Sequence, residues 1–265
     1  MCILRRVVFG AALIVMASVC RAETASIRLP EGTILPGSRS LIVVEIVKPE
    51  GQGPFPAVIL LHDCQGVQFG YEKIWAERLV PLGYLVAIPD SFTSRGYPEG
   101  TCFGDAITPL LRVDDIYATL GYLEQRTDVQ AERVGLVGFS HGAATILAAM
   151  VRPVADRAKY LVQSHHEFAA AIALYPSCSR PWLRDSRAVV PLLMLLGSRD
   201  ALTGPCQKMA DQAIQQGQPV QVTVYPEAGH AFDRTAGPAR DDSILRAQAF
   251  FSPLLRPGPS SASNK

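Results

Sequence analysis

The sequence has almost no excess of charge of either sign. Its 25 lysines and arginines and 24 aspartates and glutamates give a net charge of +1 over 265 residues. Surfaces that bind nucleic acid or anionic lipid need a clear surplus of positive charge. The composition therefore indicates no nucleic-acid partner and no charge-driven membrane binding. Internal repeats, heptads and long charge runs are also missing, which argues against solenoids and coiled coils.

The N-terminal apolar run is too short to span a bilayer. Val7 to Val19 has 13 residues, whereas a spanning helix needs about 20. The run follows Arg5 and Arg6, and Cys20-Arg21-Ala22 places small residues at −3 and −1 of a cleavage site after Ala22. Residues 1–22 are thus predicted to be a signal peptide, with an uncleaved anchor as the alternative. We expect an exported protein, periplasmic or secreted, without stable membrane association after cleavage.

The cysteines lack the C-x-x-C spacing of a metal knuckle, so we expect no metal site. Cys2 and Cys20 lie in the predicted signal peptide, and four cysteines remain: Cys64, Cys102, Cys178 and Cys206. An even number in an oxidising compartment predicts two disulfides, for which three pairings exist. Cys64–Cys102 and Cys178–Cys206 are favoured because each joins neighbouring loops. Buried free thiols are the alternative.

Apolar segments of strand length alternate with helix-like segments. Strands are predicted at 41–48, 57–61, 84–88, 134–139, 168–175, 189–196 and 220–225, and helices at 72–80, 109–126, 143–151, 205–216 and 240–255. Pro153 is expected to end the third helix, and 154–167 to form a polar excursion. This alternation predicts an α/β fold with a mostly parallel, doubly wound sheet and helices on both faces. We expect one domain over 23–256 and a disordered tail at 257–265.

One segment carries a recognisable turn, Gly138-Phe139-Ser140-His141-Gly142. It lies between a predicted buried strand and a helix, which is the arrangement of the nucleophile elbow in α/β hydrolases. Glycines two residues either side of the serine are expected because strand and helix pass closely there. An ordinary Gly-rich turn is the alternative. The segment predicts Ser140 as a nucleophile.

A serine nucleophile needs a base and an orienting acid. In α/β hydrolases these follow in the order Ser, acid, His, and Ser140, Asp200 and His230 satisfy that order at predicted strand ends. Asp90 and Asp233 are reserve candidates for the acid. The side chain of His141 is expected to pack or to hydrogen-bond locally.

The oxyanion that develops during acyl transfer needs two preorganised donors. One is expected to be the backbone N–H of His141, directly after the nucleophile. The other is expected from the loop after the strand at 57–61, at the N–H of Cys64. A disulfide at Cys64 would make that loop rigid.

Several blocks together resemble the dienelactone hydrolase family over nearly all of residues 40–255. The blocks are Leu61-His62-Asp63-Cys64-Gln65-Gly66, Pro89-Asp90-Ser91-Phe92 with Arg95, the elbow, Leu196-Gly197-Ser198-Arg199-Asp200 and Tyr225-Pro226-Glu227-Ala228-Gly229-His230-Ala231-Phe232. The resemblance implies a single-domain α/β hydrolase that opens cyclic and other small esters without metal or cofactor.

The family's founding members differ from this chain at the elbow, where they carry cysteine and this chain has Ser140. Their activating glutamate corresponds to Asp63, which we expect to be structural. Arg95 and Arg234 match two family arginines that bind the substrate carboxylate, so the resemblance implies a substrate-binding role for both. Two surface arginines are the alternative.

The leading hypothesis is a serine esterase that acts on small-molecule carboxylic esters or lactones through an acyl-enzyme. One alternative is a peptidase or amidase of the same fold. Another is a non-catalytic binding protein on the same scaffold. The natural substrate and the oligomeric state do not follow from the sequence.

Overall fold

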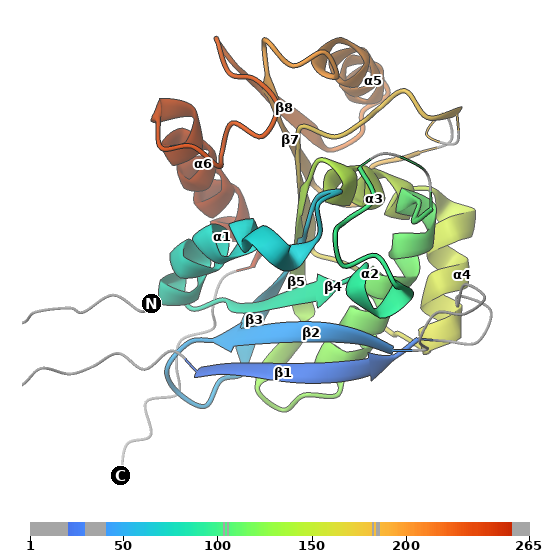
Figure 1. The fold of residues 1–265 in the computed structure, drawn as a ribbon, viewed down its shortest axis with the longest axis vertical. Helices are drawn as coiled ribbons and strands as arrows, with labels where there is room; N and C mark the ends of the chain where they lie inside the picture. Colours follow the sequence, from blue (N-terminus) through green and yellow to red (C-terminus); the bar gives the residue numbers. More distant parts are fainter. Residues whose placement is uncertain are drawn as a thin grey trace, which may run out of the picture.

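The computed structural model describes residues 21–29, 41–102, 104, 106–181, 183 and 186–255. An eight-stranded sheet with the order β1-β2-β4-β3-β5-β6-β7-β8 lies at its centre (Figure 1). The strands are β1 (Arg21–Arg28), β2 (Leu41–Lys48), β3 (Phe55–Leu61), β4 (Leu85–Asp90), β5 (Val129–Phe139), β6 (Ala170–Leu174), β7 (Leu192–Gly197) and β8 (Val220–Tyr225). From β3 to β8 all pairings are parallel, whereas β2 is antiparallel to β1 and β4. The prediction of a mostly parallel α/β-hydrolase sheet is confirmed.

Helices cover both faces of the sheet (Figure 1). One face carries α1 (Tyr71–Leu79) and α6 (Pro238–Leu254); the other carries α2 (Pro109–Glu124), α3 (His141–Ala149), α4 (Arg152–Val162) and α5 (Thr203–Gln215). Burial on both faces of the sheet explains why the sequence of β3 is apolar throughout. Ile59 and Leu61 belong to one core and Val58 and Leu60 to the other, because successive side chains point to opposite faces.

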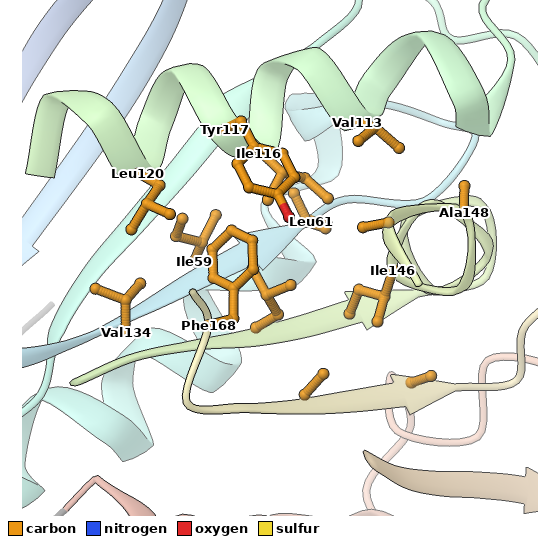
Figure 2. Packing of buried hydrophobic residues seen from close by; sticks show 14 of the residues in the cluster. Ile59, Leu61, Val113, Ile116, Tyr117, Leu120, Val134, Ile146, Ala148 and Phe168 are labelled. Atoms are coloured by element: carbon orange, nitrogen blue, oxygen red, sulfur yellow. The ribbon is translucent and has the colours of Figure 1, made fainter. Parts of the chain in front are cut away.

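The core between α2 and the sheet positions strand β3 and the loop that follows it. Figure 2 shows Val113, Ile116 and Leu120 of α2 directed toward Ile59 and Leu61 of β3. Their spacing of three and four residues places them on one helical face. All five side chains are fully buried, and such burial stabilises by roughly 1.5–3 kcal/mol per side chain. Helix α2 is therefore held firmly against the strand that leads into the predicted oxyanion loop.

Helix α4 was not predicted. We expected Pro153 to end a helix, but it lies in the first turn of α4. Proline fits there because first-turn N–H groups have no partner within the helix and its fixed φ suits helix entry. Ala155 and Ala158 are buried against the core. The expectation of a polar excursion over 154–167 is wrong for most of that range.

Strand β1 was also not predicted. It begins at Arg21, two residues before the expected mature N-terminus, and pairs along its whole length with β2. Cleavage after Ala22 would leave the pairs from Glu23 to Arg28 intact. Residues 1–20 of the predicted signal peptide and the predicted tail at 257–265 lie outside the described residues. Within the described ranges, no helix is long and apolar enough to cross a membrane.

Candidate active site

The elbow has the geometry that its glycines suggest. Ser140 has φ 49° and ψ −105° between β5 and α3. A Cβ on Gly138 would lie 2.6 Å from the carbonyl carbon and oxygen of Gly142, and a Cβ on Gly142 would lie 2.1 Å from the Leu61 oxygen. Any larger residue at either position would force strand, helix and the loop after β3 apart. The N-terminus of α3 therefore packs directly against that loop.

Three strand ends bring the triad candidates together. His230 Nε2 lies 2.9 Å from Ser140 Oγ, and His230 Nδ1 lies 2.6 Å from Asp200 Oδ2. A carboxylate can only accept, so Nδ1 carries the proton and Nε2 accepts from the Ser140 hydroxyl. Asp200 is held by a second hydrogen bond, from the N–H of Leu202 to Oδ1 at 3.0 Å. This is the arrangement that a serine needs in order to lose its proton during attack.

The two reserve acids have other partners. Asp90 accepts from the N–H groups of Phe92 and Thr93, both at 3.0 Å, and so closes the turn after β4. Asp233 accepts from Trp75 Nε1 at 2.8 Å and from the Tyr175 hydroxyl at 2.5 Å. Burial raises the pKa of Asp233, an effect that both hydrogen bonds oppose. Neither carboxylate occupies the position of Asp200 beside the histidine.

Tyr175 is a neighbour of the triad candidates that no motif in the sequence predicts. Its ring lies edge-on to the imidazole of His230, with centroids 4.8 Å apart, and its hydroxyl bonds Asp233, three residues after that histidine. Tyr175 follows the last residue of β6 and is fully buried. The only available signal was a tyrosine at a strand end, which is too common to single out.

The loop expected to carry an oxyanion donor is fixed on several sides. The Cys64 carbonyl accepts from the N–H of Thr101 at 2.7 Å, and Asp63 Oδ1 accepts from the N–H of Gln65 at 2.7 Å. A disulfide joins Cys64 to Cys102. Because Gly142 packs against the start of this loop, Cys64 and His141 come from adjoining segments. Their roles as donors stay predictions.

His62 and His141 have structural side-chain contacts. His62 is fully buried, and burial, followed by the charge of Arg112, lowers its pKa well below the usual value. His141 Nδ1 accepts from Arg112 Nη1, so its proton is on Nε2, which donates to the carbonyl of Ile107, each at 2.9 Å. The His62 ring also has local partners, the Asp63 carbonyl at Nδ1 (2.7 Å) and the Ser91 N–H at Nε2 (3.1 Å).

The structure corrects the expectation for Arg95. Its side chain is fully buried, and its guanidinium donates to Asp115 at 2.7 and 2.9 Å and to the carbonyl of Ser91 at 2.7 Å. A substrate cannot reach this guanidinium without breaking a buried ion pair, which would be costly. Arg95 therefore holds the loop after β4 to α2 instead of contacting substrate.

Arg234 lies beside the loop after β3. It forms an ion pair with Asp63, donates from Nη1 to Gln65 Oε1 at 2.6 Å and lies over the ring of Tyr71, 4.0 Å from its centroid. Its side chain is 18% exposed. Asp63 thus has the structural contact that we expected, and a substrate-binding role for Arg234 stays a prediction.

The second disulfide joins Cys178 to Cys206, so the structure has the favoured pairing. Two disulfides indicate an oxidising environment. Among the described residues, no group of three or more His, Cys, Asp or Glu side chains is arranged to hold a metal ion.

Removing the two disulfides separately should have different consequences. They close loops of 38 and 28 residues, so in the chain-entropy model each loss lowers the free energy of unfolding by about 4 kcal/mol. Cys64→Ser/Cys102→Ser should also lower kcat, because it frees the predicted oxyanion loop, whereas Cys178→Ser/Cys206→Ser should not. Urea unfolding and ester kinetics on both variants measure this. Equal effects on kcat in the two variants would contradict the special position of Cys64.

Comparisons with known proteins agree on the family. A model of the dienelactone hydrolase family matches residues 42–253. The chain is 25% identical over 119 residues to a proposed carboxymethylenebutenolidase from Synechocystis sp., covering 41% of this chain and 48% of that protein. It is 24% identical over 195 residues to another from Methylorubrum extorquens, covering 69% and 65%. The chain thus spans about half to two thirds of the length of these relatives.

Solved structures share the fold. A proposed dienelactone hydrolase from Klebsiella pneumoniae superposes with a TM-score of 0.68 at 20% identity, over 88% of this chain and 99% of that one. Esterase 2 from Thermogutta terrifontis, phosphorylated by paraoxon, gives 0.70 at 15% identity, over 90% and 96%. The family match includes the elbow and all three triad candidates. The chain therefore belongs to the dienelactone hydrolase family, a family of hydrolases.

Proposed function

We propose that the protein hydrolyses small carboxylic esters or lactones through an acyl-enzyme on Ser140. The observation that carries this proposal is the continuous hydrogen-bond chain from Ser140 Oγ through His230 to Asp200, at 2.9 and 2.6 Å. Binding alone would not require a strained serine at an elbow with a base and an acid aligned behind it.

In the proposed reaction, Ser140 Oγ attacks the ester carbonyl while His230 Nε2 takes the hydroxyl proton. His230 then returns that proton to the leaving alcohol, and an acyl-serine remains. A water molecule attacks the acyl carbonyl with the same histidine as base, which releases the acid and restores Ser140. Asp200 keeps the proton of neutral His230 on Nδ1. It also stabilises the imidazolium that forms during acylation and again during deacylation.

Negative charge collects on the former carbonyl oxygen in both tetrahedral intermediates. We propose that the backbone N–H groups of His141 and Cys64 stabilise it. Removal of one such donor typically lowers kcat by about 10²–10³-fold. The close packing of Gly142 on Leu61 and the contacts of Cys64 with Thr101 and Cys102 support a fixed distance between the two donors.

The names of the relatives support esters and lactones as the substrate class, since a butenolide is a lactone. Arg234 is the remaining candidate for contact with an anionic or polar ester, although Asp63 and Gln65 already hold it. We further propose that the protein is exported with residues 1–22 as a cleaved signal, which its two disulfides support. N-terminal sequencing of the mature protein tests that cleavage.

A fluorophosphonate probe and a substrate panel test the proposed function together. We expect one probe adduct per folded chain, mapped to Ser140 by peptide mass spectrometry, and none after heat denaturation. We also expect turnover of short-chain nitrophenyl esters and little of dipeptide nitroanilides, because an amide is the harder bond. Absence of an adduct in folded protein would overturn the enzyme hypothesis. Faster turnover of the anilides would favour a peptidase or amidase.

A further inference from the structure

Arg112 of α2 is a fully buried arginine behind the elbow. Its Nη1 donates to the carbonyl oxygen of His62 and to Nδ1 of His141, both at 2.9 Å. His62 starts the loop that leads to Cys64, and His141 directly follows Ser140. One guanidinium nitrogen therefore joins the two segments that carry the expected oxyanion donors.

The two aspartates of α2 that are close to Arg112 in sequence form ion pairs with other arginines. Asp115 pairs with Arg95, and Asp114 pairs with Arg157. Among the described residues, no carboxylate forms an ion pair with Arg112, and its buried Nε and Nη2 have no hydrogen-bond partner there. Within the described part of the chain, the hydrogen bonds of Arg112 are thus those to the His62 carbonyl and to His141.

The charge on Arg112 persists at neutral pH. Burial lowers its pKa to about 10, while the charges of Asp115, Glu72 and Asp90 raise it and that of Arg95 lowers it. The guanidinium also lies over the ring of Phe92, 5.0 Å from its centroid, in an orientation that aromatic rings favour for cations. A full positive charge is thus present one side chain away from the elbow.

We propose that Arg112 is a positioning residue for the oxyanion hole: it holds the His62 loop and the His141 segment at a fixed separation and adds positive potential behind them. This rests on the proposed function, because only a reaction with a tetrahedral oxyanion uses such potential. Preorganised charge of this kind acts in the transition state more than in the ground state. The proposal therefore predicts an effect on kcat with little effect on KM.

Arg112→Met tests the proposal because it keeps the length of the side chain and removes its charge and donors. We expect kcat for a short nitrophenyl ester to fall by about 100-fold, with KM within about twofold, since the loss resembles removal of one oxyanion donor. Affinity for an alkyl boronic acid, which mimics the tetrahedral intermediate, should fall in parallel, whereas inhibition by the neutral product alcohol should change little. Arg112→Lys keeps the charge and should recover about tenfold of kcat.

Arg157→Met is the control, because Arg157 is another arginine that contacts α2, through its ion pair with Asp114, but its side chain is half exposed. It should keep wild-type kcat and boronate affinity. Circular dichroism and thermal unfolding establish folding for each variant. If Arg112→Met does not fold, Arg112→Gln decides, because it keeps N–H donors and removes the charge: a kcat and a boronate affinity equal to those of the wild type would overturn the proposal.

The outcomes separate this inference from the proposed function. Wild-type protein that binds no fluorophosphonate and hydrolyses no ester would overturn both. Active wild type with a folded Arg112→Met variant of unchanged kcat and boronate affinity would overturn the role of Arg112 alone. A fall in thermal stability with no change in boronate affinity would show a structural role only, and would also overturn the proposal.

Discussion

Ser140→Ala is expected to lower kcat for ester hydrolysis by about 10⁶-fold, because the residues of a catalytic triad act as a unit. The substitution removes only the Oγ that lies 2.9 Å from His230 Nε2. Alanine fits the elbow at least as easily as serine, so the fold should persist. Steady-state kinetics with a short nitrophenyl ester, together with loss of the fluorophosphonate adduct, measures the effect.

Ser186→Ala is a suitable control, since its Oγ donates to the Leu147 carbonyl at 3.1 Å and has no other hydrogen bond among the described residues. It should leave kcat and labelling unchanged. A fall of only about tenfold in Ser140→Ala would point to another nucleophile, because it is far smaller than the loss expected for a triad serine.

The positions of the triad candidates could be predicted because the sheet topology alone brings the ends of their strands together. In a parallel sheet, the carboxyl ends of all strands meet at one edge. Residues that closely follow β5, β7 and β8 therefore lie near one another, independently of the conformation of the other loops. Ser140, Asp200 and His230 each follow such a strand with at most a short turn between. An error of one or two residues in a strand boundary would not have separated them.

The pairing of buried charges could not be predicted in the same way. Arg95 and Arg112 both lie between β4 and the middle of α2, and the sequence alone does not say which faces substrate. The structure pairs Arg95 with Asp115 and directs Arg112 to His62 and His141. Those contacts depend on how α2 packs against β3. The signal in the sequence was weak, because Arg112 is only one of several polar residues that α2 buries, together with Asp114, Asp115 and Thr119.

Backbone strain is concentrated around the site. Among the described residues, five that are not glycine have positive φ, and four of them follow β5, β6 or β8: Ser140 (49°), Tyr175 (40°), Glu227 (59°) and Ala231 (57°). Such conformations cost on the order of 1–3 kcal/mol each. Ala231 and Glu227 flank His230, and Tyr175 packs on its ring. The surrounding contacts, including the bonds of Asp233 to Trp75 and Tyr175, must hold this geometry.

Asp200→Asn should lower kcat by about 10⁴-fold, the size of effect that follows when an amide replaces the acid of such a triad. An amide nitrogen facing His230 Nδ1 would favour the wrong tautomer, with its proton on Nε2, where it cannot accept from Ser140. Asparagine occupies nearly the same volume, so thermal stability should change little. Ester kinetics and thermal unfolding of the folded variant measure both quantities.

Asp233→Asn is the matched comparison, because Asp233 also lies near His230 but bonds Trp75 and Tyr175 instead. Asparagine has one carbonyl oxygen for two donors, so one buried donor loses its acceptor, at a cost of about 1–3 kcal/mol. This variant should therefore lose mainly stability, and its kcat should fall far less than that of Asp200→Asn. A larger kcat loss in Asp233→Asn would make Asp233 the orienting acid, against the 2.6 Å contact between Asp200 and His230.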